Sequence, residues 1–257
     1  MITAASNSRI KRLVQLNQKS KLRRTEDVFL AEGVKMFLEA PREQLQEVYV
    51  SESFLEKCSC REYLEEVGYE VVSDSVFSKI SDTCTPQGIL CVLKQFHYNI
   101  EEMLRDKAPL FLLLENIQDP GNLGTMLRTG EGAGVSGIIM SRDTVDLYNP
   151  KVIRSTMGSI YRVPFYYADD FAAAVHQVQQ AGVSVYAAHL RGKNSYACQD
   201  YTKGTAFLIG NEGNGLREET AELADCYIRI PMEGKVESLN AAVASSILMY
   251  EAHRQRA

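Results

Sequence analysis

The sequence lacks any long hydrophobic run, and its first residues contain no apolar core. A transmembrane helix needs about 18 consecutive apolar residues, so none is expected. A secretory signal peptide is not expected either, which favours the cytoplasm. Internal repeats and low-complexity tracts are also absent. What is left is a chain of 257 residues with an ordinary apolar fraction of 45%, enough for one large globular domain or two modest ones.

Metal-binding patterns are equally scarce. The four histidines form no HExxH or paired arrangement. Six cysteines are scattered, and only Cys58 and Cys60 lie close together, with no second pair at zinc spacing. We therefore expect no metal site and thiols that are mostly reduced and structural.

The net charge of −5 gives no overall sign of nucleic-acid binding, so the distribution of charge is more informative. One basic run without any acidic residue stands near the N-terminus. It contains Arg9, Lys11, Arg12, Lys19, Lys21, Arg23 and Arg24. Such a run can neutralise phosphates, although a solvated helix face is the ordinary explanation for an isolated charge run.

The first 95 residues predict a small α/β domain, because short β-rich runs alternate with helical stretches. The expected strands are 47–50, 70–72 and 89–93, and the main helical stretch is 52–67. Residues 96–108 are polar and charged, which is typical of a connecting helix or linker. The expected division is therefore a domain over 1–95, a linker over 96–108 and a second domain over 109–257.

The second domain predicts a parallel sheet covered on both faces, since apolar strands and helical segments alternate along it. The expected strands are 110–114, 137–140, 163–166, 183–187, 207–209 and 228–230, and the expected helices are 123–131, 149–159, 171–180 and one beginning at Ser238. Gly210 and Gly234 mark loops that follow two of these strands. Loops at the carboxyl ends of strands are where an open α/β sheet binds its ligand.

A dinucleotide fingerprint, GxGxxG, is spelled by Gly132, Gly134 and Gly137. That motif binds a pyrophosphate only when it leaves a strand and opens a helix. Here it follows a helix and enters a strand. We interpret it as a helix C-cap and a tight loop, so a nicotinamide-dependent oxidoreductase is the weaker hypothesis.

Three segments in order carry a family resemblance. They are ENIQDPGNLGTMLRTGEGAG at 115–134, NEGNGL at 211–216 and IPMEGKVESLNAAVA at 230–244. They resemble the three motifs of the SpoU (TrmH-like) RNA ribose 2'-O-methyltransferases. The resemblance implies a SPOUT α/β fold with a C-terminal trefoil knot, S-adenosylmethionine (SAM) bound in the knot, and a homodimer. The segment VFLAEGVKMFLEA at 28–40 resembles the opening of an L30e-like RNA substrate-binding domain, which favours ribosomal RNA over transfer RNA as substrate.

The resemblance also assigns roles to residues. Arg128 matches the catalytic arginine of an N-x-G-x-x-x-R pattern that begins at Asn122. A guanidinium stays protonated in proteins, so we expect Arg128 to hold a phosphate and stabilise the forming alkoxide rather than act as a base. Glu212, Ser238 and Asn240 match further catalytic positions. The matched cofactor-binding positions are Gly210, Ile230 and Leu239, with Ala188, His189 and Leu190 as weaker candidates, and the basic run from Arg9 to Arg24 matches an RNA-contacting segment.

Ordinary explanations compete with several of these roles. Arg128 is also explained as an ordinary arginine on an exposed helix. Asn122 suits a turn after Pro-Gly, and Ser238 suits the N-cap of the last helix. Glu212 is expected to brace either Arg128 or a loop amide. Two further functions remain as alternatives: a transfer-RNA methyltransferase, and a non-catalytic RNA-binding protein on the same fold.

Overall fold

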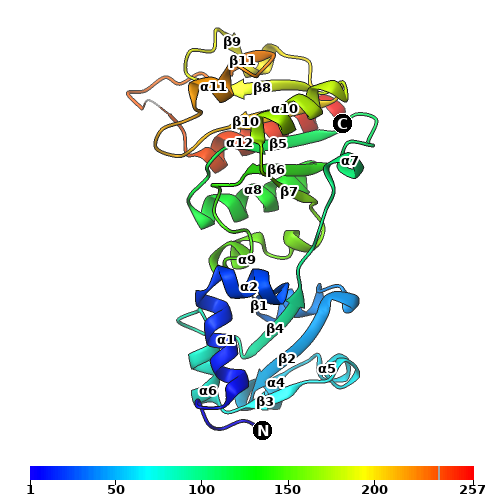
Figure 1. The fold of residues 1–257 in the computed structure, drawn as a ribbon, viewed down its shortest axis with the longest axis vertical. Helices are drawn as coiled ribbons and strands as arrows, with labels where there is room; N and C mark the ends of the chain where they lie inside the picture. The colour runs from blue at the N-terminus through cyan, green and yellow to red at the C-terminus, as the bar shows by residue number, and fades with distance from the viewer. Residues whose placement is uncertain (237) are drawn as a thin grey trace. The chain divides into compact units, whose positions relative to one another are not determined.

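The computed structural model describes residues 1–236 and 238–257 and separates into two compact units (Figure 1). The N-terminal unit comprises residues 1–96 and 146–161, and the C-terminal unit comprises residues 97–145 and 162–257. The segment 146–161 therefore packs with the first unit although it follows the beginning of the second in the chain. None of the helices formed by the described residues has the length and apolar character that crossing a membrane requires.

The N-terminal unit is built on a four-stranded sheet in the order β1-β4-β2-β3. Its strands are β1 (Val28–Glu32), β2 (Leu45–Ser51), β3 (Glu70–Val72) and β4 (Ile89–Lys94). Strand β4 runs antiparallel to β1 and β2, whereas β2 and β3 are parallel. The helices are α1 (Ser8–Gln18), α2 (Ser20–Glu26), α3 (Val34–Leu38), α4 (Glu52–Lys57), α5 (Arg61–Val67), α6 (Asp74–Ile80) and α9 (Pro150–Thr156), with short 3-10 turns η1 (Arg42–Gln44) and η2 (Ser159–Tyr161).

The spacing of apolar residues explains how α1 joins this sheet. Ile10, Leu13 and Leu16 recur every third residue and are fully buried, together with Val76 and Ile80 of α6. Such a stripe places one face of a helix against a core. The strands expected at 47–50, 70–72 and 89–93 are confirmed.

Two expected helices are wrong in their extent. The stretch 52–67 forms two helices, because the chain is extended at Cys58 and only resumes a helix at Arg61. Cysteine and serine, the residues at 58–60, have modest helix propensity and do not favour one continuous helix there. The helix expected over 149–159 ends at Thr156, since Met157 and Gly158 both take a positive φ, 52° and 101°.

Aromatic contacts join segment 146–161 to the N-terminal unit. The ring of Tyr148 lies 4.8 Å from that of Phe29, and Tyr161 Oη donates to the carbonyl oxygen of Met36 at 2.9 Å. Val152, Ile153 and Ile160 are fully buried. The core of the N-terminal unit is thus completed by residues far along the chain.

The C-terminal unit is a seven-stranded parallel sheet in the order β7-β6-β5-β10-β8-β11-β9 (Figure 1). Its strands are β5 (Leu110–Leu114), β6 (Gly137–Ser141), β7 (Phe165–Ala168), β8 (Ser184–Ala188), β9 (Asn194–Ser195), β10 (Thr205–Ile209) and β11 (Cys226–Arg229). Its helices are α7 (Ile100–Met103), α8 (Pro120–Ala133), α10 (Phe171–Gln180), α11 (Glu218–Ala221) and α12 (Ala241–Arg256), with a 3-10 turn η3 (Tyr196–Cys198). Strands β5, β6 and β10 are buried at every residue, as expected for a parallel sheet covered on both faces.

Helices α8 and α12 pack closely because small residues face each other. Ser246 Oγ lies 3.4 Å from Thr129 Oγ1, and a Cβ on Gly130 would lie 3.7 Å from the sulfur of Met249. Gly134, with φ 76°, caps the C-terminus of α8 just before β6 begins at Gly137, which confirms the interpretation of the GxGxxG pattern.

The start of the last helix differs from expectation. Helix α12 begins at Ala241, and its N-cap is Asn240, whose Oδ1 accepts from the amides of Ala242 and Val243 at 2.9 and 3.2 Å. The expected cap, Ser238, lies two residues earlier in a non-helical segment. Asparagine is as good an N-cap as serine, so the choice is made by other contacts of Asn240.

Candidate functional site

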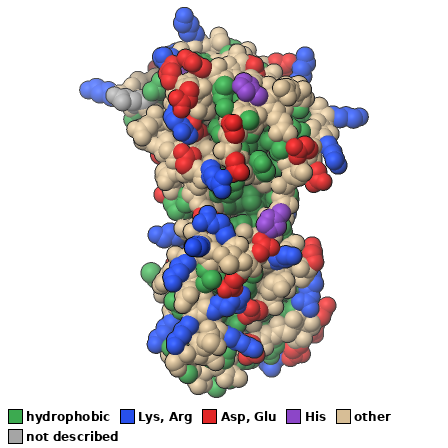
Figure 2. All heavy atoms as spheres, in the orientation of Figure 1, with side chains coloured by type: hydrophobic (Ala, Val, Ile, Leu, Met, Phe, Trp, Pro, Cys, Tyr) green, Lys and Arg blue, Asp and Glu red, His purple; other side chains and the backbone are tan. Residues whose placement is uncertain are grey.

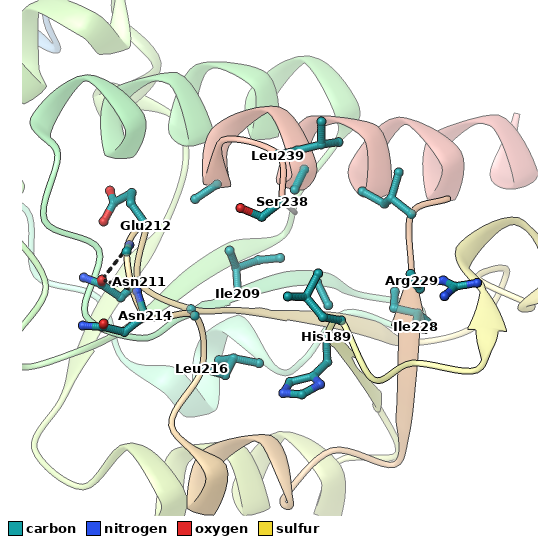
Figure 3. A pocket seen from close by; sticks show the side chains of 18 of the residues that line it. His189, Ile209, Asn211, Glu212, Asn214, Leu216, Ile228, Arg229, Ser238 and Leu239 are labelled. Atoms are coloured by element: carbon teal, nitrogen blue, oxygen red, sulfur yellow. Dashed lines mark hydrogen bonds between the residues drawn. The ribbon is translucent and has the colours of Figure 1, made fainter. Parts of the chain in front are cut away.

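A pocket of about 310 Å³ lies at the carboxyl ends of β8, β10 and β11 (Figure 3). Three loops and a helix start surround it: Ala188–Leu190, Gly210–Leu216, Arg229–Met232 and the segment from Ser238 into α12. In Figure 3, Ser238 and Leu239 approach from above while Asn211, Glu212 and Asn214 belong to the loop after β10. The volume falls in the range of small-molecule sites.

The walls of the pocket are largely apolar. Ile209, Leu216, Ile228, Met232 and Leu239 supply side chains, and polar groups come from the surrounding loops. Apolar walls with a few placed polar groups suit a ligand that has both a flat ring system and a short charged chain. The adenine and methionine parts of SAM match that description.

The loop after β10 is closed on itself. The backbones of Asn211 and Gly215 exchange two hydrogen bonds of 3.0 and 2.9 Å, and a Cβ on Gly210 would overlap Gly215 and the amide of Leu216. Asn211 Oδ1 accepts from the amide of Gly213 at 2.9 Å. The loop therefore has a defined shape before any ligand binds.

A chain of polar contacts, which we call the Asn122 bridge, links three segments through Glu212, Asn122 and Asn240. Asn122 Nδ2 donates to Glu212 Oε1 at 3.0 Å, and Asn122 Oδ1 accepts from Asn240 Nδ2 at 2.9 Å. The same Glu212 carboxylate accepts from the backbone amides of Gln118 and Asp119 at 3.1 and 3.0 Å. One carboxylate and two amide side chains thus hold together the β10 loop and the starts of α8 and α12.

The protonation of Glu212 follows from these contacts. Burial alone would raise the pKa of Glu212, but hydrogen bonds from Asn122, Gln118 and Asp119 outweigh it and hold the pKa below its ordinary value. Glu212 is therefore an anion at neutral pH and acts as an acceptor toward all of these donors.

A second carboxylate fixes the exit of the same loop. Glu115, only 1% exposed, follows β5, and its Oε1 accepts from Arg217 Nε at 2.7 Å and from Thr220 Oγ1 at 2.5 Å. Its Oε2 accepts from the backbone amide of Arg217 at 2.8 Å. The loop Gly210–Leu216 is thereby held at its exit by Glu115 and along its length by the Asn122 bridge.

His189 lines the pocket, and its pKa lies below the ordinary value for histidine. Burial lowers the pKa of His189, and the positive charge of Arg191 lowers it further, against a smaller opposing effect of Glu218. Its ring lies 5.0 Å from that of Tyr227. The imidazole is thus neutral at pH 7, which suits a pocket for a cationic ligand.

The structure gathers most of the expected site residues. All six expected cofactor-binding positions, Ala188, His189, Leu190, Gly210, Ile230 and Leu239, line the pocket, and so does Ser238. Asn122, Glu212 and Asn240 form the bridge. Glu212 accepts hydrogen bonds from loop amides, which was one of the two roles expected for it. Within the described part of the chain it makes no contact with Arg128, the other expected partner.

Arg128 lies apart from the pocket lining. It is exposed on α8, and within residues 1–236 and 238–257 it makes no ion pair. Its guanidinium is therefore available to an external anion.

The basic run near the N-terminus is divided by the fold. Arg23 is 3% exposed and pairs with Asp146 at 2.5 Å, and Arg12 pairs with Glu26 and Glu47 at 2.6 and 2.7 Å. The prediction that Arg23 contacts RNA is therefore wrong, because its guanidinium is buried in the N-terminal unit. Arg9 is exposed but pairs with Glu70. Lys11, Lys19, Lys21 and Arg24 are exposed as well, and Figure 2 shows basic side chains gathered over the region of α1.

Several site residues were missed by sequence reasoning. Glu115 stands directly after the five buried residues of β5, and Asn211 stands two residues after the end of β10. A polar residue close to the end of a buried strand was the available signal. Arg217 carried no such signal, since its role depends on a partner 102 positions away.

Comparison with known families matches two models to this chain. A model of the SpoU rRNA Methylase family matches residues 109–250, more than half of the chain, and a model of the MRM3-like substrate binding domain matches residues 7–91. The chain belongs to the SpoU rRNA Methylase family. Its α/β fold with a parallel sheet is the fold of that family.

Individual relatives of this SpoU family member span nearly its whole length. The 23S rRNA (guanosine(2553)-2'-O)-methyltransferase RlmP of Bacillus subtilis is 33% identical over 252 residues, covering 97% of both chains. The structure of AviRb from Streptomyces viridochromogenes in complex with AdoMet (SAM) matches with a TM-score of 0.88 at 25% identity, covering 97% of this chain and 98% of that one. An AdoMet-bound rRNA methyltransferase from Sinorhizobium meliloti matches with a TM-score of 0.85 at 30% identity, covering 98% and 97%.

Proposed function

We propose that this SpoU family member transfers a methyl group from SAM to a ribose 2'-hydroxyl of RNA, with ribosomal RNA as the substrate. The observation that carries the proposal is the loop pocket fixed by the Asn122 bridge. It stands in a chain that aligns end to end with an enzyme named for this reaction. The cytoplasm is the proposed place of action, since the proposed substrate is ribosomal RNA.

The residues around the pocket fit SAM as cofactor. Ile209, Leu216 and Leu239 offer apolar contacts to the ring system and the chain of SAM. Gly210 lets the backbone of its loop pass close to Gly215 and Leu216. The neutral His189 adds no positive charge against the sulfonium. When bound, SAM supplies a methyl group activated by that sulfonium.

Arg128 is the proposed cation of the reaction. A ribose hydroxyl is a poor nucleophile, so its developing negative charge needs a fixed positive group. Arg128 is exposed and has no ion-pair partner in the described part of the chain, which leaves it free to bind the phosphate next to the target ribose. Asn122 on the same helix positions the β10 loop through Glu212, and Ser238 at the pocket is the proposed contact to the ribose.

The exposed face of α12 supports a homodimer. Val243 and Tyr250 are 48% and 49% exposed and lie seven residues apart, on one side of the helix. An apolar face of this kind is typical of a protein interface. A second copy of the chain is its proposed partner.

Two features of the fold are proposed from the family. The loops after β10 and β11 converge at the pocket, and α12 returns against α8, which supports a C-terminal trefoil knot. The four-stranded N-terminal unit is proposed to be L30e-like and to contact RNA through the exposed basic residues Lys11, Lys19, Lys21 and Arg24.

The test is methyl transfer from labelled SAM to purified ribosomal and transfer RNA. We expect label in ribosomal RNA, at a ribose 2'-oxygen, which makes the adjacent phosphodiester resistant to alkali. Label in transfer RNA alone would favour the alternative substrate. Tight binding of SAM and RNA without transfer to either would favour a non-catalytic RNA-binding protein.

A further inference from the structure

The N-terminal unit contains a cleft of about 360 Å³ that is distinct in sequence and lining from the cofactor pocket. It lies where β2 and β3, which are parallel, end at their carboxyl ends, and where β4 begins. Ser51 closes β2, Asp74 opens the helix after β3, and Gly88 precedes β4. The carboxyl ends of parallel strands are the usual place for ligands in an α/β sheet.

The cleft is shaped by close approach of the chain at Gly88. Gly88 has φ 86°, and a Cβ there would lie 2.6 Å from Phe54 Cβ and 2.8 Å from Ser51 Oγ. The carbonyl oxygen of Gly88 accepts from the amide of Ser51 at 2.9 Å. These contacts fix the turn at Gly88 against Ser51 and Phe54 without any ligand, while the carboxamide of Gln87 lies next to Gly33 and Val34.

The chemistry of the lining is mixed in a specific way. Phe54, Phe77 and Pro86 form the apolar part, with Phe77 only 2% exposed as the floor. Gln87 uses Oε1 to accept from the amide of Val34 at 3.0 Å, and its Nε2 makes no hydrogen bond within the described part of the chain. Lys57 is exposed and lines the cleft together with the Asp74 carboxylate, whose Oδ1 accepts from the amide and hydroxyl of Ser53.

An aromatic wall, an uncommitted amide donor and a cation match an unstacked nucleotide. RNA-binding proteins recognise bases in loops by stacking them on aromatic side chains and by hydrogen bonds to their edges. A free side-chain amide supplies such a hydrogen bond, and a lysine suits the phosphate. Residues 7–91, which include the whole cleft, match a model of a substrate binding domain.

We propose that this cleft holds one unstacked nucleotide of the RNA substrate. Phe54 packs against the base, Gln87 donates from Nε2 to the base edge, and Lys57 faces the phosphate. The inference rests on the proposed function, because it takes RNA as the substrate. It adds a second point of recognition, located in the N-terminal unit.

Two variants of the full chain isolate these contacts. Phe54→Leu keeps apolar volume against Gly88 but removes the flat ring. Gln87→Glu keeps the oxygen that accepts from Val34, removes the donor and adds a negative charge. Gln46→Glu is the matched control, since it makes the same charge change on an exposed residue at the other end of β2.

Affinity for ribosomal RNA, KM for RNA, SAM affinity and melting temperature are measured for each protein. We expect Phe54→Leu and Gln87→Glu each to weaken RNA binding and raise KM for RNA about tenfold, the size of one lost base contact. SAM affinity and melting temperature stay unchanged, and Gln46→Glu behaves as the wild type. Wild-type RNA affinity in both cleft variants overturns the inference, as does an equal loss in Gln46→Glu, because charge alone would then explain the effect. Failure of the wild type itself to bind or methylate RNA overturns the proposed function instead.

Discussion

Asn240 Nδ2 lies 2.9 Å from Asn122 Oδ1, although 118 positions separate the two residues. The same Asn240 side chain caps α12 through its oxygen. One residue therefore starts the last helix and ties that start to α8. Because Asn122 in turn holds Glu212, the position of the loop after β10 depends on where α12 begins.

Substitutions at Asn240 separate these two tasks. Asn240→Ser keeps an N-cap oxygen but is too short to reach Asn122, so we expect a loss of about 1 kcal/mol from one hydrogen bond. Asn240→Ala also loses the cap, which adds about 1 kcal/mol. Denaturant unfolding measures the difference, and SAM titration should show weaker binding in both variants. Equal stability of the serine variant and the wild type would show that the bridge contributes nothing.

Replacement of Arg128 tests its catalytic role. Arg128→Ala removes an exposed side chain without an ion pair, so stability should change by less than about 0.5 kcal/mol. Turnover should fall by a factor on the order of 100 to 1,000, the usual effect of removing one group that stabilises transition-state charge. Arg142→Ala is the matched control, since Arg142 is an exposed arginine of the same unit that pairs with Asp169. Turnover near the wild-type rate in Arg128→Ala would end the assignment.

Two glycines of the same loop should respond differently to substitution by alanine. A methyl group at Gly210 would overlap Gly215 and Leu216, whereas one at Gly213 meets only Asn211 Oδ1 at 3.5 Å. Gly210→Ala is therefore expected to abolish measurable SAM binding, and Gly213→Ala to leave the dissociation constant within about twofold, since a methyl group there makes only an ordinary van der Waals contact with its own loop. Calorimetric titration of both variants is the measurement. Similar affinities would mean that the close approach at Gly210 does not shape the pocket.

The Glu115–Arg217 pair should show unequal costs for its two partners. Arg217→Ala leaves a carboxylate that is 1% exposed without its cation, at a cost of about 3 kcal/mol. Glu115→Gln leaves Arg217, whose side chain is 52% exposed, still able to reach water, at about 1 kcal/mol. The double variant should recover part of the loss, and a double-mutant cycle of unfolding free energies reports the coupling. A cheaper loss in Arg217→Ala than in Glu115→Gln contradicts the argument.

SAM binding should depend on pH through His189. The pKa of His189 is lowered by burial and by Arg191, so the folded protein protonates it only below the ordinary value of about 6.5. The unfolded chain takes up that proton at a higher pH than the folded protein does. The free energy of unfolding therefore decreases as the pH falls from about 6.5 through the folded pKa. A protonated ring would also repel the sulfonium. SAM affinity should therefore be constant near neutral pH and decrease at lower pH, with a midpoint below about 6.5. His189→Phe, which keeps a ring beside Tyr227, should flatten that fall; an unchanged profile would assign it to another group.

Sequence patterns predicted the sheet and the pocket well, for local reasons. Strands such as Leu110–Leu114 are continuous apolar runs, and Gly210 and Ile230 stand at strand ends where loops must turn. The gathering of six expected residues around one pocket follows from that arrangement, with the loop positions taken from the family motifs.

The remaining features depended on contacts distant in the chain. Asn240 rather than Ser238 caps α12 because Asn122 binds it, and Arg23 is buried because Asp146 receives it. Neither partner is visible from local composition. The cleft of the N-terminal unit likewise depends on the approach of Gly88 to Phe54, which no periodicity predicts.

The division of the chain into two units has a consequence for recombination. The backbone passes from one unit to the other after Phe96, Val145 and Tyr161, so neither unit corresponds to one continuous stretch of coding sequence. A chimera that exchanged only residues 1–96 with a relative would place a foreign sheet against Val152 and Ile153. An exchange of the N-terminal unit between relatives therefore requires residues 146–161 to be inherited together with the N-terminal segment.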